Sequence, residues 1–120
     1  IIVAADNNHM NVLKLLLEKG ANPNRQAADG RTALSVAAQA GRDRMVSTLL
    51  DHAADPNILV DHGDTALIVA VRAHRTTIVR MLLEHKADIS DTDVTGRTIL
   101  DLAEERHFDD IVQMLRKAGA

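Results

Sequence analysis

Residues 30–57 read GRTALSVAAQAGRDRMVSTLLDHAADPN, and residues 63–90 read GDTALIVAVRAHRTTIVRMLLEHKADIS. The two stretches align without a gap at an offset of 33 residues, and the same pattern extends toward both ends of the chain. Agreement at so many positions is not a chance event, so the sequence predicts a tandem repeat. The recurring positions carry one residue type in successive units: Gly30, Gly63 and Gly96; Thr32, Thr65 and Thr98; Leu34, Leu67 and Leu100; Ala4, Ala37, Ala70 and Ala103; Leu16, Leu49, Leu82 and Leu115.

The composition favours the same architecture. The 120 residues are 46% apolar, yet Phe108 is the only aromatic residue besides the histidines. A single thick core of this size normally uses several aromatic rings as bulky fillers. Alanine, leucine, valine and isoleucine suit many thin, similar layers better than one thick core.

Each unit is expected to hold two helices. The recurring threonines stand where an N-cap belongs, ahead of a short run with helical spacing of its apolar residues. A left-handed turn is expected next, because its shared position holds residue types that tolerate positive φ. The second helix is longer and more amphipathic. The turn position is occupied by Asn8, Gly41, His74 and His107, and the apolar face of one second helix by Met45, Val46, Leu49 and Leu50.

The second helices are expected to end near Gly20, Ala53, Lys86 and Gly119. Glycine is the favoured residue just past a helix end, where φ is often positive. Ala53 and Lys86 are therefore expected to carry strain of about 1 kcal/mol each. The turn-forming residues that follow predict a projecting loop before the next unit, which we call a finger.

These units resemble the ankyrin repeat, whose consensus reads G-x-T-P-L-H-x-A-A-x-x-G-H, then a leucine-rich helix, then G-A-D-x-N. The resemblance extends over the whole chain and implies an all-α solenoid of stacked helix-turn-helix units with projecting β-turn fingers. It implies one domain, with repeats at about 1–26, 27–59, 60–92 and 93–120. Ser35, Ile68 and Asp101 replace the consensus histidine, so its hydrogen-bond network must be missing or rebuilt. We expect a less stable array than a consensus sequence would form.

The two ends of the repeat array predict different neighbours. Ile1 aligns with Leu34, which leaves Ile2 and Val3 poorly covered, so we expect additional repeats upstream. In the last unit Glu104 stands where the inner units have small apolar residues, which is typical of a capping repeat. The alternative is a tolerated charge with another repeat beyond it.

Catalysis and metal binding have little support in the sequence. The chain has no Cys, and Ser35, Ser47 and Ser90 lie at unrelated points of the repeat. Of the six histidines, His52 and His85 share a repeat position, but no HExxH motif and no i, i+4 pair occurs. We therefore expect no enzyme activity, no cofactor and no metal site.

The charge and hydropathy patterns indicate a protein or peptide as the partner. A formal net charge of −3 disfavours nucleic acid, which usually needs a basic face. The longest apolar stretch, residues 66–71, is far short of the ~20 residues of a membrane helix. Neither nucleic acid nor a membrane is therefore expected to be bound.

The resemblance implies that a partner binds on the concave face, which is made of finger tips and exposed positions of the first helices. Three consecutive apolar finger residues stand out, and they either mark a contact site or fold back onto the adjacent finger. We expect a mixed-charge groove with an apolar spot near the third finger. The candidate residues are Asp29, Arg31, Gln39, Ile58, Leu59, Val60, Asp61, His62, Asp64, Arg72, Thr95, Arg97, Glu105 and Arg106.

Two functional interpretations remain. The first is a protein-interaction module that belongs to a larger scaffold or adaptor, monomeric as a segment. The second is the substrate-recognition segment of a multidomain ligase, kinase or methyltransferase whose catalysis lies elsewhere. The resemblance also implies an intracellular location, cytoplasmic or nuclear.

Overall fold

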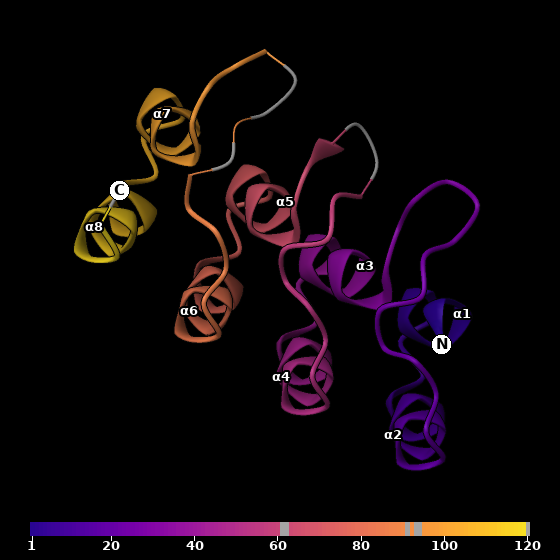
Figure 1. The fold of residues 1–120 in the computed structure, drawn as a ribbon. Coiled ribbons are helices and arrows are strands. Elements are labelled where there is room, and N and C mark those ends of the chain that lie inside the picture. Colours follow the sequence, from indigo (N-terminus) through magenta and orange to yellow (C-terminus); the bar gives the residue numbers. More distant parts are fainter. Residues whose placement is uncertain (61–62, 91, 93–94, 120) are drawn as a thin grey trace.

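The structure is a computed structural model that describes residues 1–60, 63–90, 92 and 95–119. The described chain forms helices in consecutive pairs, each pair joined by a short turn (Figure 1). The all-α repeat architecture predicted from the sequence is confirmed. The helices are α1 (Ile2–Asp6), α2 (Met10–Glu18), α3 (Ala33–Ala40), α4 (Asp43–Asp51), α5 (Ala66–Arg72), α6 (Thr76–Glu84), α7 (Ile99–Glu105) and α8 (Asp109–Lys117).

The helices lie in two layers. In Figure 1 the first helices α1, α3, α5 and α7 form one row, and the second helices form the row below it. Each inner first helix packs against its own second helix and against the first helices on both sides. The fingers project on the side of the first helices, and the molecule measures 40 × 25 × 21 Å.

The predicted N-caps are confirmed. Thr32 Oγ1 accepts a hydrogen bond from the Ser35 backbone N–H at 3.1 Å, and the Ser35 hydroxyl oxygen accepts one from Thr32 N–H at 3.0 Å. Thr98 and Asp101 make the same reciprocal pair, whereas the cap at Thr65 lacks the return bond. Two of the residues that replace the consensus histidine therefore complete a capping box of the first helix.

The backbone adopts positive φ at the turn position of every helix pair. The φ values are 57° at Asn8, 75° at Gly41, 56° at His74 and 60° at His107, as the sequence predicts. Positive φ also occurs just past the ends of two second helices, at residues that are not glycine. The φ values are 67° at Ala53 and 64° at Lys86. The expected strain at these two sites thus has a structural basis.

The core lies between the layers and continues from unit to unit. Ala37, Ala70 and Ala103 are fully buried, and their small side chains allow neighbouring first helices to pack closely. Aliphatic residues of the second helices fill the space below them, with Leu49, Leu82 and Leu115 also fully buried. Burying one such leucine contributes about 1.5–3 kcal/mol, so the repeated layer replaces the aromatic fillers that the chain lacks.

Polar side chains connect successive units through the fingers. Asn24 Oδ1 accepts a hydrogen bond from the Asp55 backbone N–H at 2.7 Å. Asn57 Oδ1 accepts the equivalent bond from Asp88 N–H at 2.6 Å. In both cases a side chain of one unit satisfies a backbone group of the next unit.

A polar cluster joins the third and fourth units on the second-helix side. The Thr76 hydroxyl donates to Asp110 Oδ2 at 2.7 Å, and His74 Nε2 lies 3.2 Å from Asp110 Oδ1. The His74 ring stacks on Phe108 with 3.8 Å between centroids. The Thr76 hydroxyl, followed by the Ile111 N–H and His74, lowers the pKa of Asp110 below its ordinary value of 3.8.

Replacing Ala53 by glycine should stabilise the protein. Relief of the positive φ outweighs the added chain entropy of glycine, so we expect the free energy of unfolding to rise by about 0.5–1 kcal/mol. The control is Ala40→Gly, an exposed helical position, which should lower it by about 0.5–1 kcal/mol. Urea unfolding measures both changes, and a loss of stability in Ala53→Gly would contradict the strain.

The Thr76→Val variant should lose stability in a pH-dependent way. A carboxylate with a lowered pKa stabilises the fold above its unfolded pKa, and this contribution disappears as the pH falls through its lowered folded pKa. We therefore expect Thr76→Val to be less stable than the wild type at pH 7, with the gap shrinking below about pH 4. Chemical unfolding at several pH values measures the gap. Thr77→Val, at the exposed neighbouring position, should show no such convergence, and a pH-independent loss in Thr76→Val would be inconsistent with the role of Asp110.

Candidate functional site

A groove of about 360 Å³ lies between the second and third units. Its walls are α3 and the end of α5, and its edge is formed by residues of two fingers. The surface combines charged, polar and apolar groups, which suits a polypeptide segment more than a purely apolar ligand. The lining residues are Arg31, Ser35, Gln39, Val60, Asp64, Val69, Arg72 and Ala73.

An ion pair forms part of the groove wall. Arg72 Nη1 donates to Asp64 Oδ2 at 2.8 Å, and Asp64 is only 6% exposed. The Asp64 carbonyl oxygen also accepts from Val60 N–H at 2.7 Å, which closes the base of the finger. On the other side, Arg106 Nη1 donates to the Arg72 carbonyl oxygen at 3.2 Å. The pair is therefore held by backbone contacts that involve both the finger and the fourth unit.

The apolar triplet of the third finger is divided between two environments. Val60 is buried and lines the groove, Ile58 is half-buried, and Leu59 is 58% exposed. Gln26 Nε2 donates to the Leu59 carbonyl oxygen at 2.9 Å, so the second finger holds the backbone at this point. The triplet thus presents Leu59 to solvent and buries Val60, and a partner contact at Leu59 stays a prediction.

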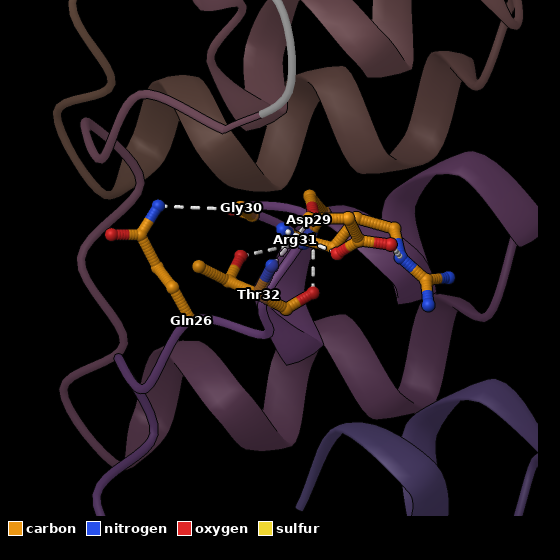
Figure 2. A network of polar contacts seen from close by, with 6 residues as sticks. Gln26, Asp29, Gly30, Arg31 and Thr32 are labelled. Carbon is orange, nitrogen blue, oxygen red and sulfur yellow. Dashed lines mark hydrogen bonds and ion pairs between the residues drawn. The ribbon is translucent and has the colours of Figure 1, made fainter.

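The second finger presents an arginine to the same groove. Arg31 Nε donates to Asp29 Oδ2 at 2.8 Å, and Gln26 Nε2 donates to the Gly30 carbonyl oxygen (Figure 2). The Arg31 backbone N–H also donates to Asp29, and this bond, followed by the arginine side chain, lowers the pKa of Asp29. Asp29 thus anchors one side of the guanidinium.

The remaining candidates belong to the fourth unit. Arg97 forms an ion pair with Glu105 and donates from Nε to the Thr95 hydroxyl oxygen at 3.1 Å. These residues do not line the groove, although Arg106 reaches back to Arg72. Asp61 and His62, which the sequence also selects, lie outside the described residues.

The structure brings five of the sequence-selected residues together in one groove: Arg31, Gln39, Val60, Asp64 and Arg72. The lining also contains Ser35 and Val69, which the sequence does not predict, and Ala73, which follows Arg72 at an exposed first-helix position where the sequence predicts partner contacts. Helical spacing offered a signal for two of them, because Val69, Arg72 and Ala73 lie at i, i+3 and i+4 and share one face. The sequence marks Ser35 as a departure from the consensus and as a serine without a catalytic partner, and neither feature points to the groove.

His52 and His85, which share a repeat position, each form a hydrogen bond with the residue four positions earlier. His52 Nδ1 donates to the Thr48 carbonyl oxygen, and His85 Nδ1 donates to that of Met81, both at 2.9 Å. Within the described ranges, no group of three or more His, Cys, Asp or Glu residues could hold a metal ion. A search of the same residues finds no helix that is both long enough and apolar enough to span a bilayer.

Comparison with known families agrees with the fold. Residues 1–60 match the family model described as "Ankyrin repeats (3 copies)", and residues 49–103 match "Ankyrin repeats (many copies)". The chain therefore belongs to the ankyrin repeat family, whose members are generally non-catalytic protein–protein interaction modules. A search of curated proteins gave no match.

Removing Arg72 should destabilise the fold, because the buried Asp64 carboxylate would lose its cation. We expect Arg72→Met to lower the free energy of unfolding by about 1–3 kcal/mol. The double variant Asp64→Leu/Arg72→Met should recover most of this loss, since no unpaired charge remains buried. Urea unfolding of the single and double variants measures the coupling, and strictly additive losses would contradict it.

Proposed function

We infer that this domain binds a protein or peptide segment along the groove between α3 and α5 and the adjoining third finger. The single observation that carries this function is the groove itself, in which an ordered ion pair and apolar side chains share one open surface. Binding sites of this kind combine apolar contact area with a few fixed polar groups that orient the ligand.

The size of the groove supports a short segment as the occupant. About 360 Å³ accommodates one or two side chains at the lower end of ligand-site volumes. Leu59 adds an exposed apolar contact on a finger whose backbone is tied to its neighbour through Gln26. A bound segment would thus meet a pre-formed surface and need little ordering of the domain.

The domain fits best as part of a larger scaffold or adaptor, monomeric as a segment. Val3 and Val12 are exposed, whereas their equivalents in the next unit, Val36 and Met45, are buried. This difference supports a further helix pair upstream that packs on α1 and α2. We propose a cytoplasmic or nuclear setting for such a module, as the resemblance to ankyrin repeats implies.

The Leu59→Asp variant tests this function. Peptides selected from a random displayed library on the wild-type chain serve as probes, and fluorescence anisotropy measures their affinity. We expect Leu59→Asp to weaken them at least about tenfold, because a charge replaces an exposed apolar contact on the finger beside the groove.

The matched control is Leu15→Asp, which makes the same change at a 53% exposed leucine on α2, away from the groove. It should leave the affinities within about twofold. Both variants should keep the wild-type melting temperature, because both side chains are largely exposed. Equal binding to the wild type and Leu59→Asp would remove the third finger from the binding surface.

A further inference from the structure

In the third and fourth units, the same two repeat positions hold one acidic and one basic residue each. The first position lies at the base of the finger, and the second lies eight residues later, at the end of the first helix. The third unit places Asp64 and Arg72 there, and the fourth unit places Arg97 and Glu105. The order of the charges is reversed, but in both units the two side chains form an ion pair.

The second unit has only half of this pair. Arg31 occupies the first position, and the neutral Gln39 occupies the second. Arg31 engages Asp29 through Nε, and its two terminal nitrogens make no hydrogen bond to any residue that the structure describes. Figure 2 shows these nitrogens at the outer end of the side chain, beyond the Asp29 carboxylate.

Arg31 lies in the groove already described. Among the residues that the structure describes, the charged lining residues are Arg31, Arg72 and Asp64. Asp64 forms its ion pair with Arg72, so Arg31 adds a positive charge to this described lining. Asp29 is 54% exposed at its side chain and lies outside the lining, so solvent weakens its competition for Arg31.

We propose that the groove binds the carboxylate of a glutamate or aspartate side chain in the partner segment, with Arg31 as its counter-ion. In the fourth unit, Glu105 provides the carboxylate that pairs with Arg97. In the second unit the equivalent residue, Gln39, is neutral, so the partner provides the carboxylate for Arg31. The terminal nitrogens of a guanidinium suit a carboxylate, because they can donate two parallel hydrogen bonds to it. This assignment rests on the proposed function of the groove.

Apolar groups of the groove favour an acid carried on a peptide over a free carboxylate. Val60 and Val69 line the same space as Arg31, and Val60 adjoins the exposed Leu59. They can contact the methylene groups of the acidic residue and its apolar neighbours. The expected segment therefore contains an acidic residue next to an aliphatic one.

The decisive variant is Gln39→Glu, which supplies the missing acid from within the chain. Gln39 is exposed, so this change should leave the fold intact, and the new carboxylate should occupy Arg31. Gln113→Glu, at an exposed position on α8, makes the same change in net charge away from the groove. Arg31→Gln removes the counter-ion itself and serves as an independent second variant.

The probes are the peptides selected on the wild-type chain, each resynthesised with its acidic residues changed one at a time to the neutral amide. In each peptide, we expect one acidic residue whose replacement lowers the affinity at least about fivefold in low salt. Gln39→Glu and Arg31→Gln should each weaken the acidic peptide by a similar factor and leave the neutral peptide unchanged. Gln113→Glu should change neither.

The outcomes separate this inference from the function on which it rests. Peptides that lose affinity on Leu59→Asp, but ignore both their own acid and Gln39→Glu, would overturn the carboxylate site and leave the binding function standing. Peptides that ignore Leu59→Asp as well as Gln39→Glu would overturn both. Equal weakening by Gln113→Glu and Gln39→Glu would reveal only general charge repulsion, and the carboxylate site would also fall.

Discussion

The structure depends on the inability of any single helix pair to bury its own apolar surface. A pair such as α3 and α4 has apolar residues toward both neighbours, and α3 packs between α1 and α5. Close packing is possible because the contact positions hold alanine, with Ala37 and Ala70 fully buried. Stability is therefore cooperative along the array, with each layer completed by the next.

The same constraint explains where the polar groups lie. Some backbone groups of the fingers pair within their own finger, and side chains such as Asn24 and Asn57 satisfy others in the neighbouring unit. The capping threonines satisfy the starts of the first helices. With the helix ends and fingers fixed in this way, the groove residues are held on a scaffold whose polar groups are largely satisfied, which is the condition for a pre-formed binding surface.

Repetition made most of the fold predictable from the sequence. The caps at Thr32, Thr65 and Thr98 and the positive φ at Ala53 and Lys86 follow from local chemistry read at fixed intervals. The candidate site was less accessible, because it depends on side-chain directions within irregular loops. Nothing in the sequence of three apolar residues distinguishes the buried Val60 from the exposed Leu59. The partner of each groove arginine also became visible only once distances between side chains were known.

The links within and between units have a consequence for how such a chain can evolve. The Asp64–Arg72 and Arg97–Glu105 pairs each close inside one unit, and the bonds from Asn24 and Asn57 end on main-chain amides, which nearly every residue possesses. Neither of these two devices requires a particular side chain in the adjoining unit, in contrast to the bond between Thr76 and Asp110. A unit can therefore be duplicated, exchanged or moved by recombination and keep the ion pairs and the asparagine bonds. Natural selection is then left to vary the groove while the array goes on folding.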